Sequence, residues 1–569
     1  MSVVERMKIG PASLLGLCAG AVVGLAACQL ALLGTARLAQ FAPGMFFNTW
    51  LIALGWAACE LLRGWRPSLG WLTWALVPSV LFACGLVFAH TWFFDVAIER
   101  RLTLLDMSWS GVGYFFAVAL PARGLLAMLA LFAGALGCAC LFDRLRVRPQ
   151  ARHWQLLTAC LALLCAPLVL LPARIPSPLF DSAQELWELA TRPKVVASGT
   201  AQPELLRALD RSSDSRGSQP LAFKKVIVLV METMTARNFA LEGEQLAEHA
   251  FLRRERAHFH SFARYFPNNQ DSRTGMLDML FSRLIPYEAY SDEGVAHYRP
   301  LARLPSLVER MRELSFRAAF AVSQLSSEDV VGDLAWDEQL RLDEAQIASA
   351  RGEHKLCFAP DEYESSCEDL VLLPKIVDFV ARSEHAFVYQ EFIWGHAAEY
   401  NEASGKSNAQ YYSDYLDALT RALAERGLAD ETLIALTSDH GFRDRGRQHE
   451  PEVYRVPLLF YAPRFTSARD ERLFSHVDFA ALLFERLSPH QPRVASSPIA
   501  MIVGPTGQGH VFAVNDRGGH LLLREKLGLS MLIAREGSWQ LAPGSILAAF
   551  EQYRAQFDSH MQRARERTP

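Results

Sequence analysis

The stretch Thr432-Leu-Ile-Ala-Leu-Thr-Ser-Asp-His-Gly441 joins an apolar run to two adjacent polar side chains. The apolar run is typical of a buried strand, and polar, glycine-bearing loop sequence follows it. This pattern predicts a strand whose carboxyl end presents Asp439 and His440 side by side. Open α/β sheets bind their ligands at that edge, where a carboxylate and an imidazole can face one divalent metal ion.

Strand and helix patterns alternate on both sides of this stretch. The run Val226–Met231 is continuously apolar, which is typical of a central parallel strand. The alternation predicts a mostly parallel sheet, covered on both faces by helices, over residues 223–490. The other predicted strands cover 318–323, 386–392, 432–437 and 456–461, and the predicted helices cover 274–283, 302–314, 370–382, 407–426 and 476–487.

The pattern changes after residue 490. The sequence predicts a hairpin that turns at Asp516-Arg-Gly-Gly519, and a second strand pair is expected across Glu536-Gly-Ser538. A helix with a charged face follows from residue 545 onward. Residues 491–569 are therefore expected to form a small C-terminal antiparallel β subdomain with a terminal helix.

The first 174 residues differ in composition from the rest of the chain. The 569 residues are 51% hydrophobic with a formal net charge of −4, but long apolar runs occur only before residue 175. A bilayer-spanning helix needs about 20 apolar residues, so residues 1–174 are expected to form an α-helical transmembrane domain. Its five predicted spans are 11–34, 45–62, 69–94, 124–142 and 154–173, and a juxtamembrane linker follows over 175–222.

Basic residues between the predicted spans indicate their orientation. Arg63 and Arg66 follow the second span, a cluster of arginines follows the fourth, and Arg6 and Lys8 precede the first. Positive charge favours the cytoplasmic side, so everything after residue 174 is expected outside the cytoplasm. The soluble part has no basic stripe of the kind that indicates nucleic-acid binding.

Cys357 and Cys367 are the cysteines of the part expected outside the cytoplasm. The other eight lie in or beside the predicted spans, where they are interpreted as small packing residues. An oxidising compartment favours a disulfide between two cysteines ten residues apart. Two free thiols are the alternative interpretation.

Glu232 and Thr274 lie in positions that suit the same site. Glu232 follows the strand that ends at Met231, although a helix N-terminal acid is the alternative. Thr274 precedes a helical run, where a metal ion could turn its hydroxyl into a nucleophile. A plain N-cap is the alternative for Thr274, and Ser272 is its nearest rival as nucleophile.

Two histidines and an arginine cluster complete the candidate residues. His396 follows a predicted strand and His449 lies in a loop, although a surface position is the alternative for each. Arg443 and Arg447 follow the Asp-His pair closely and suit an anionic substrate or lipid headgroup, with a solvated loop as the alternative. The acid, hydroxyl and imidazole groups together suit a divalent metal ion, namely Mn, Zn or Mg.

Six motifs carry a resemblance to a known family. They are Val226-Ile-Val-Leu-Val-Met-Glu-Thr-Met234, Ser272-Arg-Thr-Gly275, Leu304-Pro-Ser-Leu-Val-Glu-Arg-Met311, Trp336-Asp-Glu338, Thr432–Gly441 and Arg455-Val-Pro-Leu-Leu-Phe-Tyr-Ala-Pro463. With five predicted spans ahead of them, the chain resembles the membrane-bound branch of the alkaline phosphatase and sulfatase superfamily. That branch includes lipoteichoic acid synthases, phosphoglycerol transferases and phosphoethanolamine transferases.

The resemblance implies a fold, a location and a set of residue roles. The fold would be an alkaline-phosphatase-like α/β domain after a five-span helical domain, and the location a bacterial inner membrane with the catalytic domain in the periplasm. The implied catalytic residues are Thr274, His396 and His449, the substrate-binding residues are His396, Arg443 and Arg447, and the metal ligands are Glu232, Thr274, Asp439 and His440.

The activity that the resemblance implies is transfer of a phospholipid headgroup. Phosphoglycerol or phosphoethanolamine would pass from a phospholipid donor to an envelope glycan or lipid through a phospho-threonine intermediate. True sulfatases need a Cys/Ser-x-Pro-x-Arg motif, and Asp271-Ser-Arg-Thr-Gly-Met276 lacks it, which makes a sulfatase-like hydrolase a minor alternative. Two rival functions stay open at this point: a phosphodiesterase or phosphatase, and a catalytically degenerate envelope-assembly protein.

Overall fold

The computed structural model divides the chain into two compact units, residues 1–192 and 193–569. The five predicted spans and their orientation lie outside the residues that the structure describes. Among the helices that it does describe, none combines the length and the apolar character needed to cross a bilayer. The described residues are 191–199, 202–213, 217, 220–242, 246, 249–286, 299–323, 331–353, 356–358, 366–395, 401, 403–441, 450–503, 510–526 and 529–566.

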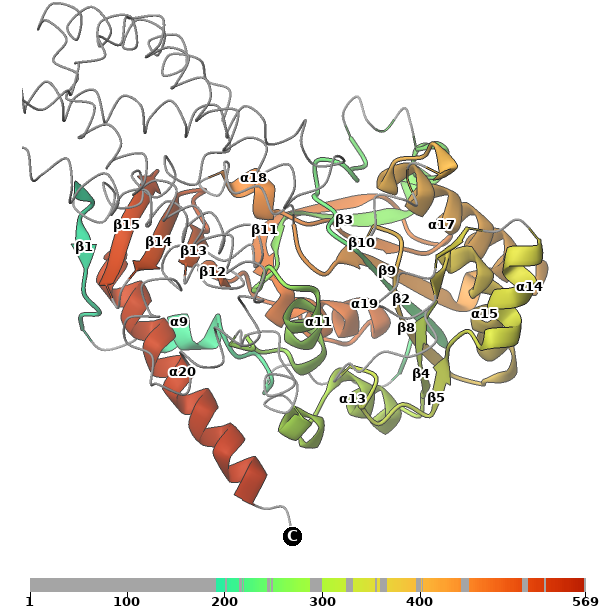
Figure 1. Ribbon diagram of the computed structural model, residues 1–569, viewed down its shortest axis with the longest axis horizontal. Coiled ribbons are helices and arrows are strands. Elements are labelled where there is room, and N and C mark those ends of the chain that lie inside the picture. Colours follow the sequence, from blue (N-terminus) through green and yellow to red (C-terminus); the bar gives the residue numbers. More distant parts are fainter. Residues whose placement is uncertain are drawn as a thin grey trace, which may run out of the picture. The chain divides into compact units, whose positions relative to one another are not determined.

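An eight-stranded sheet forms the centre of the second unit, in the order β11-β3-β10-β9-β2-β8-β4-β5 (Figure 1). β2 (Lys225–Met231) lies inside the sheet and is buried along its whole length. It runs parallel to β8 (Ala386–Glu391) and β9 (Thr432–Ser438), as the apolar runs predict. A strand covered on both faces is apolar throughout, which explains the uninterrupted Val-Ile-Val-Leu-Val sequence of β2.

The outer strands make the sheet mixed. On one side of β8, β4 (Arg317–Val322) and β5 (Glu338–Leu340) continue in parallel. On the other side of β9, β10 (Leu458–Tyr461) runs antiparallel to both β9 and β3 (Phe259–Phe266). β11 (Ala468–Ser475) then pairs in parallel with β3. Among these eight described strands only β10 opposes the common direction, so the predicted mostly parallel sheet is confirmed.

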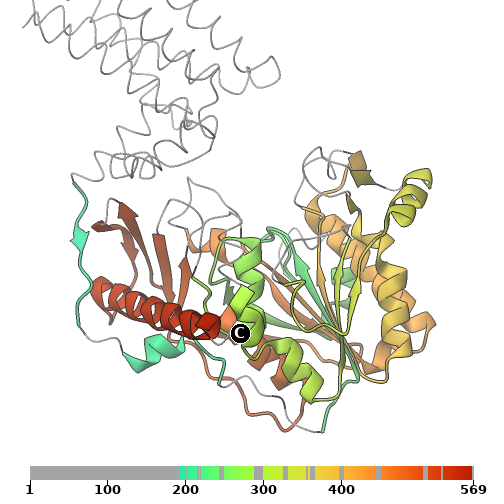
Figure 2. The same ribbon diagram turned by 60° about the horizontal axis from the view of Figure 1, so that its bottom comes forward.

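Helices cover both faces of the sheet, as the alternating pattern predicts. Figures 1 and 2 show α11, α13 and α19 on one face and α15 and α17 on the other. The face that α15 turns inward carries Ile376, Phe379 and Val380, which are buried. The helix bounds are α10 (Ala250–Glu255), α11 (Ser272–Phe281), α13 (Leu307–Glu313), α14 (Glu344–Gly352), α15 (Leu373–Arg382), α17 (Asn408–Glu425), α18 (Pro451–Tyr454) and α19 (Phe479–Leu487).

A second, antiparallel sheet follows in the order β1-β15-β14-β13-β12. The predicted hairpin is confirmed, since β13 and β14 flank Asp516-Arg-Gly-Gly519. The second strand pair expected across Glu536-Gly-Ser538 is wrong, because β15 pairs back onto β14 and its other neighbour is β1, from the predicted linker. The bounds are β1 (Lys194–Val195), β12 (Ile499–Val503), β13 (His510–Asn515), β14 (His520–Lys526), β15 (Leu529–Glu536), and two helices, α9 (Pro203–Arg207) and α20 (Pro543–Glu566).

The predicted disulfide between Cys357 and Cys367 is confirmed, with an S–S distance of 2.06 Å. The two cysteines face each other in a short antiparallel pair, β6 (Cys357–Phe358) and β7 (Ser366–Cys367). The Cys367 amide donates to the Ser323 carbonyl just after β4, so the bridge lies beside the carboxyl edge of the large sheet.

Candidate metal centre

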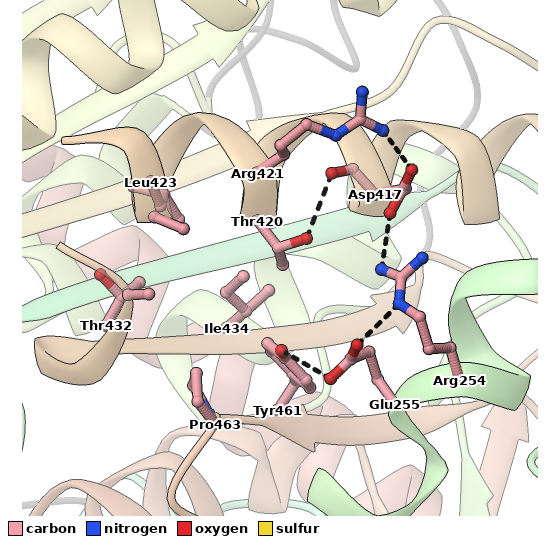
Figure 3. Close-up of a pocket in the computed structure, with 12 residues that line it drawn as sticks. Arg254, Glu255, Asp417, Thr420, Arg421, Leu423, Thr432, Ile434, Tyr461 and Pro463 are labelled. Carbon is pink, nitrogen blue, oxygen red and sulfur yellow. Dashed lines mark hydrogen bonds and ion pairs between the residues drawn. The ribbon is translucent and has the colours of Figure 1, made fainter. Parts of the chain in front are cut away.

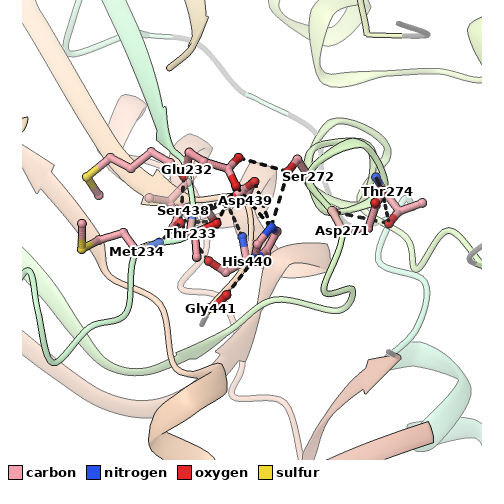
Figure 4. A network of polar contacts seen from close by, with 12 residues as sticks. Glu232, Thr233, Met234, Asp271, Ser272, Thr274, Ser438, Asp439, His440 and Gly441 are labelled. Atoms are coloured by element: carbon pink, nitrogen blue, oxygen red, sulfur yellow. Dashed lines mark hydrogen bonds and ion pairs between the residues drawn. The ribbon is translucent and has the colours of Figure 1, made fainter. Parts of the chain in front are cut away.

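Glu232, Asp439 and His440 meet where two neighbouring parallel strands end. Met231 of β2 is paired with Ser438 of β9, so the residues that follow leave the sheet side by side. The three side chains are buried, and one ligand atom from each lies within 4.8 Å of the others. His440 Nε2 is 3.6 Å from Glu232 Oε1 and 3.5 Å from Asp439 Oδ2 (Figure 4). The juxtaposition predicted from the strand ends is confirmed.

The hydrogen bond of His440 Nδ1 turns the other ring nitrogen toward the carboxylates of the cluster. Its Nδ1 lies 2.7 Å from the Gly441 carbonyl oxygen, which can only accept. Nδ1 therefore carries a proton, and Nε2 is the ring nitrogen that faces the two carboxylates. Metal-binding histidines are commonly oriented in this way by a carbonyl group on their other nitrogen.

The two oxygens of Asp439 have different surroundings. Oδ1 accepts from the amides of Thr233 (3.0 Å) and His440 (2.6 Å) and from the Ser438 hydroxyl (3.1 Å). Oδ2 has no hydrogen-bond partner within the described part of the chain. Burial opposes ionisation, yet His440 and the hydrogen bonds to the carboxylate hold the pKa of Asp439 below its ordinary value. A buried, ionised oxygen without a donor fits a bound cation.

Backbone strain places Glu232 in this cluster. The next residue, Thr233, has a φ of 51°, a conformation that costs a non-glycine residue roughly 1–3 kcal/mol. This conformation lets the Thr233 amide reach Asp439 while its hydroxyl donates to Glu232 Oε1. Gly395 approaches from β8 with a φ of +107°, and a Cβ there would lie 3.1 Å from that of Glu232.

Ser272 and Thr274 lie on opposite sides of the first turn of α11. The Ser272 hydroxyl is 3.0 Å from Glu232 Oε2 and 3.4 Å from His440 Nε2. The hydroxyl of Thr274 instead lies 3.4 Å from both the carbonyl and the side-chain oxygen of Asp271. Residues two positions apart in an α-helix are separated by about 200° around its axis, so only one of Ser272 and Thr274 can face the cluster. Figure 4 shows Ser272 on that side and Thr274 turned away from it.

Asp271 and Gly275 determine which side of α11 faces the cluster. Asp271 is the N-cap, and its carboxylate accepts from the Thr274 amide. Gly275 lies against the loop after β9, where a Cβ would come within 2.3 Å of the Asp439 carbonyl oxygen. The close approach that glycine permits brings the start of the helix, and with it Ser272, to the metal centre.

The remaining predicted site residues, His396, Arg443, Arg447 and His449, lie outside the described residues. Their substrate and catalytic roles stay predictions. Tyr412 is a site neighbour that sequence reasoning did not single out. Its hydroxyl accepts from the Glu232 amide, although the two residues are 180 positions apart, and a tyrosine in a helical pattern carries no signal for this role.

A pocket of about 360 Å³ lies away from this centre, between α10, α17 and the amino end of β9 (Figure 3). Its charges are paired within it: Arg254 contacts Glu255 and Asp417, and Arg421 also contacts Asp417. Asp439 and His440 follow the opposite end of β9. The pocket is therefore separate from the candidate metal centre.

The fold and the site define a class: an α/β domain with a buried Glu-Asp-His centre at the carboxyl edge of its sheet. Residues 224–488 match the protein-family model described as Sulfatase. This part of the chain is a sulfatase-family domain, which confirms the resemblance at the level of the superfamily. No curated protein matches the chain.

Solved structures resemble part of this chain at low sequence identity. A protein of the alkaline phosphatase superfamily from Vibrio parahaemolyticus is 14% identical, with a TM-score of 0.44, and covers 64% of this chain and 98% of its own. The lipoteichoic acid synthase LtaP from Listeria monocytogenes is 11% identical, with a TM-score of 0.44, and the match covers 63% of this chain and 97% of LtaP. The soluble domain of lipooligosaccharide phosphoethanolamine transferase A from Neisseria meningitidis is 13% identical, with a TM-score of 0.35, and the match covers 50% of this chain and 95% of that domain.

Proposed function

We propose that this protein is a metal-dependent transferase that moves a phospholipid headgroup, phosphoglycerol or phosphoethanolamine, onto an envelope glycan or lipid. The observation that carries the proposal is the Ser272 hydroxyl, 3.0 Å from Glu232 Oε2 and 3.4 Å from His440 Nε2. A hydroxyl at a helix start, beside a carboxylate and an imidazole, is the arrangement of an activated nucleophile. We assign the nucleophile to Ser272, in place of Thr274.

The side chains present fit a divalent metal ion. Glu232, Asp439 and His440 would hold it, because they bring two carboxylates and an imidazole nitrogen within 4.8 Å of one another. When bound, such an ion lowers the pKa of a neighbouring hydroxyl and stabilises negative charge on a phosphoryl group. Mn, Zn and Mg all suit this mixture of oxygen and nitrogen ligands.

The proposed reaction has two displacements at phosphorus. Ser272 Oγ loses its proton, attacks the phosphorus of the lipid headgroup, and breaks the bond to diacylglycerol, which leaves as an alcohol. The headgroup phosphodiester is then attached to Ser272. A hydroxyl of the acceptor attacks the same phosphorus, and the Ser272 oxygen leaves and regains a proton. His396 and His449 are the groups proposed to protonate or stabilise leaving oxygens.

Two features of the chain support a phosphoryl rather than a sulfuryl group. The residues around Ser272, Asp271-Ser-Arg-Thr-Gly275, lack the motif that sulfatases need for formylglycine. The five apolar segments before residue 175 would hold the site near its lipid donor and raise the effective concentration of that donor. On this proposal the catalytic domain lies in the periplasm beside the inner membrane.

Mass spectrometry of the full-length protein tests this function. The protein is incubated with a divalent metal and vesicles that contain phosphatidylglycerol and phosphatidylethanolamine. We expect diacylglycerol release and a headgroup adduct on the peptide that contains Ser272, and the added mass identifies the headgroup. Absence of an adduct together with absence of diacylglycerol release contradicts the proposal. Passage of the adduct to water alone, with every glycan and lipid acceptor offered, identifies a phosphodiesterase instead.

A further inference from the structure

Asp369 is a buried carboxylate next to the disulfide and outside the metal centre. It is fully inaccessible to solvent, at the start of a short 3-10 helix (Asp369–Val371). Its Oδ1 accepts from the Ile393 amide (3.1 Å) and the Ser323 hydroxyl (2.8 Å), and its Oδ2 from the Trp394 amide (3.1 Å). Burial raises its pKa to about 6. Both oxygens therefore hold the segment that follows β8.

This segment leads to the backbone of Glu232. The Trp394 carbonyl accepts from the Tyr412 hydroxyl at 2.6 Å, and the same hydroxyl accepts from the Glu232 amide at 3.2 Å. Burial, followed by the charges of Glu232 and Asp369, raises the pKa of Tyr412 well above its ordinary value. The phenol stays neutral, so it can donate to one backbone group and accept from the other.

Ring packing fixes the same segment from the side. The Trp394 indole stacks on Tyr411 with a centroid distance of 3.6 Å, and its Nε1 donates to Asn401 Oδ1. Gly395 follows at a positive φ and lies against the Cβ of Glu232. The position of Glu232 is thus set by a chain of contacts through Asp369, the Trp394 backbone and Tyr412.

We propose that Asp369 and Tyr412 are positioning residues for the metal centre, acting on Glu232 through its backbone. The inference rests on the proposed metal site but not on the proposed transfer reaction. Groups that orient metal ligands from behind typically change metal affinity by about 10- to 100-fold when they are removed. Loss of the Tyr412 hydroxyl leaves the Glu232 amide and the Trp394 carbonyl without this partner, which frees the segment to shift.

Manganese binding to the full-length protein, measured by calorimetry, tests the inference. Tyr412→Phe is expected to raise the Kd for Mn²⁺ by about 10- to 100-fold, and Asp369→Asn by about tenfold. Tyr415→Phe is the matched control, because Tyr415 lies on the same helix, is equally buried, and donates to Gln390 at 2.7 Å. A merely structural role would lower the stability of both tyrosine variants alike and leave their Kd for Mn²⁺ unchanged.

Two outcomes overturn the inference: a folded Tyr412→Phe protein with wild-type Mn²⁺ affinity, or an equal loss of affinity in Tyr415→Phe. If Tyr412→Phe fails to fold, Asp369→Asn decides by the same measurement. Failure of the proposed function is distinguishable. A wild-type protein that binds no Mn²⁺, Zn²⁺ or Mg²⁺ removes the metal site itself. A protein that binds metal with the expected variant effects, but transfers no headgroup, removes only the transfer reaction.

Discussion

Gly275 controls how closely α11 approaches the metal centre, and Gly275→Ala tests this directly. The added Cβ would lie 2.3 Å from the carbonyl oxygen of Asp439 and 3.1 Å from its carbonyl carbon. Both atoms belong to the backbone, so no change of rotamer relieves the clash. A Cβ contact shorter than 3.0 Å is essentially never found, so the helix or the Asp439 loop must move by at least about 0.7 Å.

Such a movement separates Ser272 from the carboxylate beside it. Catalytic groups need placement within about 0.5 Å of their productive geometry. A displacement of about 1 Å costs on the order of 100-fold in rate. We therefore expect Gly275→Ala to lower turnover by about 10- to 100-fold, which corresponds to about 1.4–2.7 kcal/mol of activation free energy.

Gly352→Ala provides the matched control, since Gly352 also lies in a helix and its added Cβ would have nothing within 4 Å. The assay is single-turnover release of diacylglycerol from phosphatidylglycerol vesicles, with limited proteolysis to establish that each variant is folded. Gly352→Ala should behave as wild type. A folded Gly275→Ala protein that keeps turnover within twofold of wild type would refute the steric account of how Ser272 is placed.

Three further outcomes are expected. Ser272→Ala should lower turnover at least about 1,000-fold, whereas Thr274→Ala should keep it within about tenfold because its hydroxyl contacts Asp271 instead of the cluster; the reverse result in the diacylglycerol assay returns the nucleophile to Thr274. Asp439→Asn should weaken Mn²⁺ binding by roughly 100-fold or more, since the asparagine side chain keeps an oxygen that accepts from the backbone amides but loses the negative charge. A wild-type Kd for Mn²⁺, measured by calorimetry on this variant, contradicts this expectation. Burial raises the pKa of Asp369 to about 6, so the stability that its protonated form provides is complete below its unfolded pKa and is lost as pH rises through 6. Relative to Asp369→Asn, wild type should therefore lose about 2 kcal/mol between pH 4 and 7 in pulse proteolysis, and a pH-independent difference contradicts the assignment.

The central strands of the fold were predictable because burial on both faces demands apolar residues. β2 and β9 satisfy that condition along their whole length. β3 and β11 do not, and the sequence did not predict them. In β11 the residues Arg469 and Glu471 are charged and exposed, because this strand forms an edge of the sheet. An edge strand takes its structure from its partner, and a pattern read along one chain segment does not contain that partner.

The candidate site also has a part that the sequence predicts and a part that it does not. Glu232, Asp439 and His440 were predictable because parallel strands end together at one sheet edge. The choice between Ser272 and Thr274 depends on which side of α11 faces the site. The sequence predicted that this helix starts at residue 274, whereas α11 starts at Ser272. Two positions along a helix correspond to about 200° around its axis. A prediction that is wrong by two residues therefore selects a side chain on the far side of the helix from the site.

Asp369 shows why stability and site geometry need separate consideration in this fold. Its buried carboxylate costs stability once ionised, above the raised pKa of about 6. A neutral side chain would avoid that cost, but an amide has a single oxygen, and the amides of Ile393 and Trp394 occupy two. The two oxygens fix the segment whose carbonyl receives the Tyr412 hydroxyl, next to the Glu232 amide. A group that weakens the fold at neutral pH while ordering the backbone behind a metal ligand is better explained by the demands of the site than by those of the scaffold.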